Sequence, residues 1–126
     1  MLQAMNTGHD GSMTTIHANC SADVLLRLEV LVQMAADLPV TSIHRQIASA
    51  VDLIVQVARL RDGSRRVIQI SEIVDYDETM KQIRMKDLFL LNDEEQRPKL
   101  CATGCLPTFM EKLIEVGLLD LSTFYH

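Results

Sequence analysis

The chain has 126 residues, of which 48% are hydrophobic and 23% are charged, so it has the size of one small domain and is too apolar for a disordered tail. Its 12 Lys and Arg against 17 Asp and Glu give a net charge of −5, which argues against a generic nucleic-acid-binding domain. None of the five glycines precedes a lysine, so the phosphate-binding loop GxxxxGK[ST] cannot occur in this sequence. Neither a signal peptide nor an apolar run of the ~20 residues that a membrane helix needs is visible, and we expect a soluble, cytoplasmic chain.

The first half of the chain predicts a helix end, one strand and two helices. Residues 1–6 resemble the last turns of a helix, which the Gly-containing stretch 7–11 then ends. Residues 12–17 are rich in β-branched side chains between these breakers, which predicts a strand. Apolar residues then recur at helical spacing over 21–37 and again over 41–50, so each of these ranges predicts a helix with one buried stripe.

The second half predicts a β-meander followed by a helix. Residues 53–60 predict a strand, and Arg61-Asp62-Gly63-Ser64 predicts a tight turn in which Asp-Gly supplies the positive φ angles. Returning strands are expected over 65–74 and 82–91, with a charged loop over 92–99. Pro107 can then open a last helix, whose apolar side is formed by Phe109, Met110, Leu113, Ile114 and Leu118.

This order of elements predicts an α/β fold that is incomplete by itself. The first part is typical of a slice of a parallel α/β sheet, and the second part is typical of an antiparallel addition to it. A strand of parallel type at 12–17 needs neighbouring strands, and no upstream residues supply them. We therefore interpret the chain as the back part of something larger.

The candidate chemistry lies around the strand expected at 12–17. His9 precedes this strand, Thr15 lies in it, and His17 leaves it at the carboxyl end, where open α/β sheets bind their ligands. Imidazoles beside a threonine hydroxyl can contact phosphate oxygens or orient an acidic group. The alternative from composition alone is two histidines hydrogen-bonded in loops. A zinc site of His9, His17 and Cys20 matches no standard spacing, so we expect no metal site and reduced cysteines.

Several blocks of the sequence resemble one family. Met5-Asn6-Thr7-Gly8-His9-Asp10-Gly11-Ser12-Met13-Thr14-Thr15-Ile16-His17-Ala18-Asn19 closely resembles the histidine box of the type II/type IV secretion and pilus-assembly ATPases, and most closely the CpaF type of the tight-adherence pilus system. The stretches 45–55 and 59–67 resemble the segments that follow the box in that family. Thr103-Gly104, Pro107, Phe109 and Glu111-Lys112-Leu113 resemble its C-terminal signature, so the resemblance runs nearly from end to end.

The resemblance implies a fold, a set of partners and a location. It implies the C-terminal part of a RecA-like P-loop NTPase, with a core segment over 1–60, a β-hairpin and meander over 61–100, and a C-terminal helix over 101–126. In the family the motor is a homo-oligomer, a hexameric ring at the cytoplasmic face of the inner membrane, where platform proteins are its partners and no nucleic acid is implied. ATP and Mg²⁺ are the cofactors of the full-length family, and none is expected bound to this piece.

The resemblance also implies roles for individual residues. His9, Thr15 and His17 match the histidine box, which implies catalytic positions near the γ-phosphate and the subunit boundary. Arg59 and Arg61 can face a neighbour's nucleotide, or they can be the solvated rim of a hairpin. The family couples ATP hydrolysis to protein export or pilus assembly, but this piece lacks the phosphate loop and the catalytic glutamate and is not expected to hydrolyse ATP alone. The alternative is a non-catalytic interaction module that self-associates or docks on full-length subunits.

Overall fold

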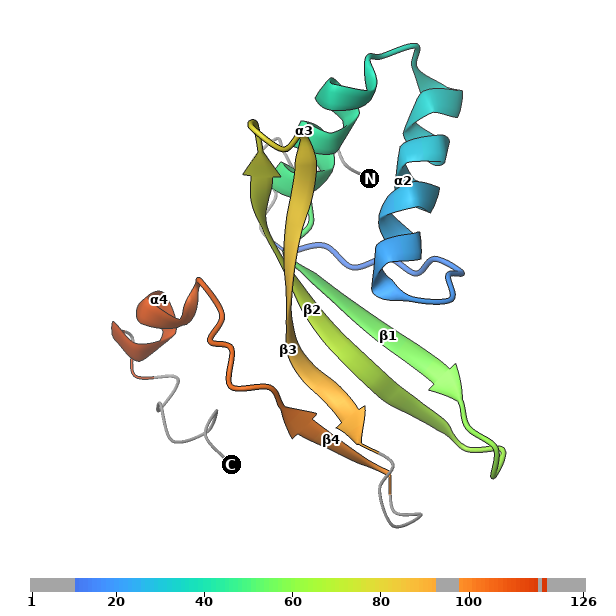
Figure 1. Cartoon of the computed structure of the whole chain (residues 1–126), viewed down its shortest axis with the longest axis vertical. Coiled ribbons are helices and arrows are strands. Elements are labelled where there is room, and N and C mark those ends of the chain that lie inside the picture. Colours follow the sequence, from blue (N-terminus) through green and yellow to red (C-terminus); the bar gives the residue numbers. More distant parts are fainter. Residues whose placement is uncertain (1–10, 93–97, 116, 118–126) are drawn as a thin grey trace. The chain divides into compact units, whose positions relative to one another are not determined.

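A computed structural model describes residues 11–92, 98–115 and 117 of the chain (Figure 1). In chain order the elements are α2 (Ser21–Ala35), α3 (Val40–Ala50), β1 (Leu53–Arg59), β2 (Arg65–Asp77), β3 (Gln82–Asn92), β4 (Lys99–Ala102) and α4 (Met110–Glu115). The chain divides into two compact units, which are described separately below. The first, unit 1, holds the residues up to Ile54 together with Ile73–Met85, and unit 2 holds Val55–Glu72 and the residues from Lys86 onward.

The four strands form one sheet in the order β1-β2-β3-β4, so each strand pairs with the next one along the chain (Figure 1). Short turns join the first three strands, which makes the neighbours antiparallel. In the last pair, Leu90 of β3 stands opposite Cys101 of β4. The meander expected from the sequence is therefore confirmed, and β2 continues to Asp77 beyond its expected end.

The core of unit 1 forms between the two long helices and the sheet. Ile43 and Ile47, one turn apart on α3, are completely buried, and they pack with Val24 and Leu28 of α2. Ile73 of β2 joins the same cluster. Each fully buried aliphatic side chain of this kind contributes about 1.5–3 kcal/mol through the hydrophobic effect, so this cluster is what holds the helices on the strands.

Both predicted helices are confirmed, with small differences at their ends. Helix α2 begins at Ser21 as expected and ends at Ala35, two residues before the expected end. Its N-cap residue is Cys20, whose side chain makes no capping hydrogen bond, while the Ser21 side chain is buried. The Asp23 carboxylate in the first turn accepts a hydrogen bond from the Asn19 N–H at 3.1 Å, which ties the segment before the helix to that turn.

The strand expected at 12–17 is wrong. In the described part of the chain, residues 11–17 run without secondary structure and make no backbone hydrogen bond to another segment. A strand is defined by its pairing, and the sheet offers this segment no partner. For the same reason the expected slice of a parallel sheet is not found in the described strands, whose pairing is antiparallel throughout.

Two further differences lie near the C-terminal end. The charged loop expected over 92–99 leads into a short strand, β4, which the sequence analysis missed. The last helix begins at Met110 and not at Pro107, and the extension expected up to Leu118 lies outside the described residues, as do the helix end expected at 1–6 and His9. No helix among the described residues is long and apolar enough to cross a bilayer.

Candidate functional site

Thr15 and His17 lie in the segment that leads into α2. Ile16 between them is half-buried and packs against the core of unit 1, whereas Thr15 and His17 are exposed. Thr15 lines a surface hollow of about 610 Å³ and His17 lines another of about 560 Å³, whereas Ile16 contributes to both. Both predicted site residues are thus accessible, and their role in a site stays a prediction.

An ion pair on α2 stands beside His17. His17, Asp23 and Arg27 line the same surface hollow of about 560 Å³. The Asp23 carboxylate accepts hydrogen bonds from the Asn19 N–H and, at 3.2 Å, from the Arg27 Nε, which together hold the pKa of that carboxyl below its ordinary value. This hollow thus offers an anionic acid, a guanidinium and an imidazole.

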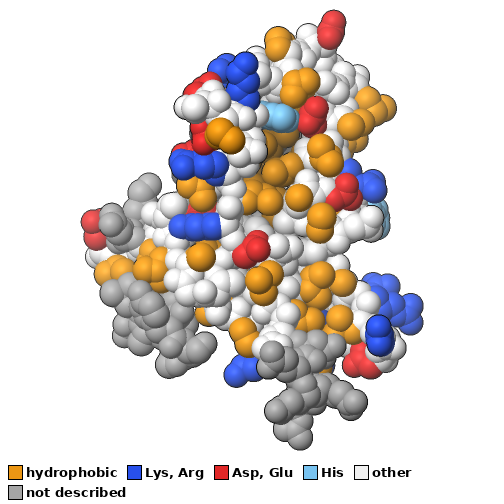
Figure 2. All heavy atoms as spheres, viewed as in Figure 1, with side chains coloured by type: hydrophobic (Ala, Val, Ile, Leu, Met, Phe, Trp, Pro, Cys, Tyr) orange, Lys and Arg blue, Asp and Glu red, His pale blue; other side chains and the backbone are white. Residues whose placement is uncertain are grey.

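The predicted nucleotide-contacting arginines lie at the β1–β2 hairpin of unit 2. Arg59 and Arg61 are exposed, as are Arg65 and Arg66 on the returning strand, and basic side chains gather around this turn in Figure 2. The one acid of the turn, Asp62, is engaged within it, because its carboxylate accepts hydrogen bonds from the Ser64 hydroxyl at 2.6 Å and from the Ser64 N–H at 2.8 Å.

These hydrogen bonds lower the pKa of Asp62, the Ser64 hydroxyl having the largest effect. Gly63 closes the turn with a φ of +86°, a conformation that suits glycine. The hairpin therefore presents four guanidinium groups around one acid that is already hydrogen-bonded. Guanidinium groups bind phosphate oxygens through paired N–H donors, so this turn can contact a polyphosphate.

The described residues could contact the phosphates of a bound nucleotide but not its metal ion. Thr15 and His17 belong to unit 1 and Arg59 and Arg61 to unit 2, so each pair is a site by itself in this structure. Within the described ranges no group of three or more His, Cys, Asp or Glu side chains lies together in a way that could hold a metal ion. The side chains present can contact phosphate, and none of them is assigned as a ligand of Mg²⁺.

Unit 2 contains a buried polar cluster that the sequence did not indicate. Glu72 in the middle of β2 is only 2% exposed. Its carboxylate accepts hydrogen bonds from the Thr108 N–H, at 3.0 and 3.1 Å, and from the Thr108 hydroxyl, and the Lys86 ammonium lies 3.5 Å away. Lys86 also donates to the Leu106 carbonyl. The cluster fastens the turn before α4 to strands β2 and β3.

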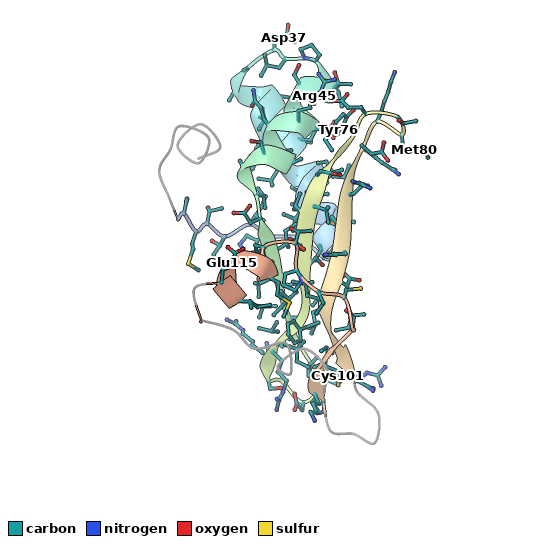
Figure 3. The ribbon with its side chains drawn as sticks, turned by 90° about the vertical axis from the view of Figure 1, so that its left-hand side faces the viewer. Asp37, Arg45, Tyr76, Met80, Cys101 and Glu115 are labelled. Carbon is teal, nitrogen blue, oxygen red and sulfur yellow. The ribbon has the colours of Figure 1, made fainter. Side chains whose placement is uncertain are left out.

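A second cluster that the sequence analysis missed links α3 to β2 within unit 1 (Figure 3). Arg45 forms two hydrogen bonds with Glu78, and its guanidinium carbon lies 5.6 Å from the centre of the Tyr76 ring. His44 is hydrogen-bonded to Glu29 of α2 at 2.9 Å. Because every one of these charged groups has a partner, we interpret this cluster as structural and not as a ligand site.

Comparison with known proteins places this site in a family. The sequence profile described as "Type II/IV secretion system protein" matches residues 1–108, which include Thr15, His17 and both hairpin arginines. The conjugal transfer protein TrbB of Rhizobium radiobacter is 42% identical over 76 residues, 60% of this chain and 22% of TrbB. A candidate conjugal transfer protein of Mycobacterium tuberculosis is 41% identical over 71 residues, 56% of this chain and 20% of the relative.

The chain thus spans about a fifth of the length of the curated relatives that it matches. The family match covers a larger share of this chain than the pairwise matches do, because it includes all but the last 18 residues. Helices α2 and α3, the four strands, the histidine-bearing segment and the arginine hairpin all fall inside that match. The chain belongs to the type II/IV secretion system protein family.

Proposed function

We propose that this chain supplies the histidine-bearing C-terminal part of a motor ATPase that couples ATP hydrolysis to transport of macromolecules across the cell envelope. The observation that carries this proposal is the family match over residues 1–108, together with the exposure of Thr15 and His17 in the segment before α2. In the proposed motor, RecA-like subunits form a hexameric ring at the inner membrane, held there by platform proteins. ATP and Mg²⁺ are bound mainly by residues outside this chain.

The proposed roles of the site residues follow from their chemistry. Thr15 and His17 lie at the γ-phosphate side of the nucleotide, where a hydroxyl and an imidazole can donate hydrogen bonds to phosphate oxygens. His9 is assigned the same role by its place in the histidine box. Arg59 and Arg61 contact a nucleotide held by the neighbouring subunit, where their charge offsets that of the phosphates.

The transported cargo is the finer part of the proposal. The sequence blocks favour a CpaF-type motor of a tight-adherence pilus, whereas the names of the relatives refer to conjugal transfer. Both assignments use the same motor chemistry and differ in the platform protein that the ring contacts. We favour the pilus motor because the histidine box most closely resembles that type.

Hydrolysis of radiolabelled ATP by the purified chain tests the catalytic part of the proposal. Without phosphate-loop amides and lysine, little stabilises the triphosphate or its transition state, so we expect no turnover above that of buffer. Robust turnover by the purified chain would show that it carries a different, self-sufficient site.

Binding of a fluorescent ATP analogue at low salt tests the arginine hairpin. We expect weak binding that falls with added salt and disappears in the double variant Arg59→Ala/Arg61→Ala. The matched control is Arg84→Ala, which removes a guanidinium already paired with Asp75 and should leave the binding unchanged. Equal binding by the double variant and the control would assign the hairpin to the solvated rim of the sheet.

A non-catalytic interaction module is the second candidate function, and one observation favours it. Helix α2 carries a second apolar stripe of Leu26, Val30 and Met34, which are 54–81% exposed. A helix that is apolar on both faces is usually covered on both. Light scattering at high concentration separates the two candidates, because a monodisperse monomer would argue against self-association.

A further inference from the structure

The β1–β2 hairpin concentrates positive charge at one turn of unit 2. Residues 59–66 include four Arg and one Asp, in a chain whose net charge is −5. Across the described ranges, none of these four arginines forms an ion pair. Like charges held close together destabilise a folded segment, and a bound anion that offsets them restores the lost stability. The turn therefore has the charge of an anion-binding site.

The hydrogen bonds of the turn place two of the arginines opposite each other. The Leu60 N–H donates to the Ser64 carbonyl at 2.8 Å, and the Leu60 carbonyl accepts from the Gly63 N–H at 2.9 Å. Leu60 and Ser64 are therefore the last pair before the turn. Strand β1 ends at Arg59 and β2 begins at Arg65, so these two residues form the next pair. Opposite residues of an antiparallel pair project from the same face, with Cβ atoms about 4.5–5.5 Å apart.

The acid of the turn does not compensate this pair. Like charges directly opposite each other destabilise a sheet. The Ser64 hydroxyl has the largest effect in lowering the pKa of Asp62, and the charge of Arg66 lowers it further. The Arg66 Nε also donates to the Ser64 hydroxyl at 3.4 Å. Asp62 is thus engaged with Ser64 and Arg66, and within the described ranges Arg59 and Arg65 keep their charges without an acidic partner.

We propose that Arg59 and Arg65 together form a clamp for the terminal phosphate of a polyphosphate. Each guanidinium can donate two parallel hydrogen bonds to one phosphate group, and a doubly charged group with three free oxygens can accept from both. An acidic side chain has only two oxygens and one charge, so it fits a single guanidinium. Arg61 lies in the turn outside the pair and contributes its charge alone.

This clamp adds a residue and a geometry to the proposed function. Arg65 has no role in the motor proposed above, and the clamp makes it the direct partner of Arg59. The identity of the polyphosphate as a nucleotide of a neighbouring subunit rests on the proposed function. The clamp itself rests only on the hydrogen bonds and charges of the hairpin, so the two proposals can fail separately.

Binding of inorganic tripolyphosphate to the purified chain, measured by titration calorimetry at low salt, tests the clamp without a nucleotide. Arg65→Gln and its matched control Arg61→Gln remove the same charge from the same turn. We expect Arg65→Gln to lower the affinity at least about tenfold and Arg61→Gln no more than about threefold, because only Arg65→Gln removes hydrogen bonds to the phosphate. Trimetaphosphate, a cyclic anion without a terminal phosphate, should bind about tenfold more weakly than tripolyphosphate.

The stability of the ligand-free chain is a second readout, which a purely structural arginine would move in the opposite direction. Arg65→Glu replaces a like-charge pair by an ion pair with Arg59, so it should raise the Tm by about 1–4 °C while it abolishes binding of tripolyphosphate. In the unaltered chain, tripolyphosphate itself should raise the Tm, because it binds only the folded hairpin.

Three outcomes would overturn the clamp. Equal losses of affinity in Arg65→Gln and Arg61→Gln would leave only a diffuse positive charge at the turn. A fall in the Tm of ligand-free Arg65→Glu would show that Arg65 stabilises the hairpin. Binding to vesicles that contain phosphatidic acid, without binding of tripolyphosphate, would assign the arginines to a lipid headgroup. Failure of the motor proposal would leave all of these results unchanged, because none of them uses ATP or its hydrolysis.

Discussion

Replacement of Glu72 by alanine should destabilise unit 2 more than any surface substitution in the chain. The carboxylate is 2% exposed and receives both the N–H and the hydroxyl of Thr108, with the Lys86 ammonium 3.5 Å away. Hydrogen bonds to a charged group contribute about 1.5–3 kcal/mol each, and they are not additive. The Lys86 side chain is 28% exposed, so water compensates part of its charge when Glu72 is removed, and the loss of the two Thr108 hydrogen bonds carries most of the cost.

We therefore expect Glu72→Ala to lower the free energy of unfolding by about 3–5 kcal/mol, a large part of the 5–15 kcal/mol that is usual for a domain. For a chain of this size the corresponding fall in Tm is about 10–20 °C. Urea unfolding followed by circular dichroism measures the free energy, and a thermal scan measures the Tm. Glu115→Ala, at an exposed position of α4, is the control and should change the stability by less than about 0.5 kcal/mol.

A double-mutant cycle then separates the hydrogen bond from the charge. Thr108→Val removes the hydroxyl donor and keeps the N–H, whereas Glu72→Gln keeps an acceptor and removes the charge. Because the two side chains are in direct contact, their coupling energy should be about 0.5–3 kcal/mol. Unchanged stability of Glu72→Ala, or a coupling energy of zero in the cycle, would refute the view that this cluster fastens the turn before α4.

Three further predictions concern other parts of the chain. Ile47→Ala, at a completely buried position of α3, should cost about 2–5 kcal/mol in urea unfolding because it leaves a cavity in the core of unit 1. Gly63→Ala should lower the free energy of unfolding by about 1–2 kcal/mol, because an alanine is strained at a φ of +86° although its methyl group would meet only Arg59, at 3.9 Å. A thermal scan measures this loss. The hydrogen bond from Arg45 lowers the pKa of Glu78 below its ordinary 4.5, so the folded state gains stability that is lost as the pH falls from about 4.5 through the lower pKa of the folded state. Glu78→Gln lacks this titration, so its free energy of unfolding should fall less steeply in acid than that of the unaltered chain.

Each of these predictions has a result that contradicts it. A cost below about 1 kcal/mol for Ile47→Ala would mean that the core closes around the gap. The control is Val40→Ala at an exposed position of the same helix, which should cost no more than about 0.5 kcal/mol. Equal stability of Gly63→Ala would mean that the turn adopts another conformation. An acid transition of Glu78→Gln that coincides with that of the unaltered chain would place the acid sensitivity elsewhere, for example at Asp75, whose pKa Arg84 also lowers.

The helices and the meander could be predicted because their signals are local. The spacing of Ile43 and Ile47 identifies one face of α3 without knowledge of any other element, and Asp62-Gly63 identifies its turn in the same way. The strand expected at 12–17 could not be decided from its own residues, because β-branched composition describes a strand only where a neighbour exists. Strand β4 was missed for the opposite reason, since its four residues have little pattern and are positioned by their register with β3.

The residues of the candidate site and of the polar clusters also divide into those with a local sequence signal and those without one. Thr15 and His17 could be predicted as site residues because they belong to a contiguous block, and the arginines because they gather in one turn, and the roles of both groups stay predictions. The Glu72 cluster joins residues that are 36 positions apart, and nothing in the neighbourhood of either residue announces the contact. Glu72 lies between apolar residues at 70 and 73, and this is a weak signal, because an acidic residue needs a partner once its position is buried.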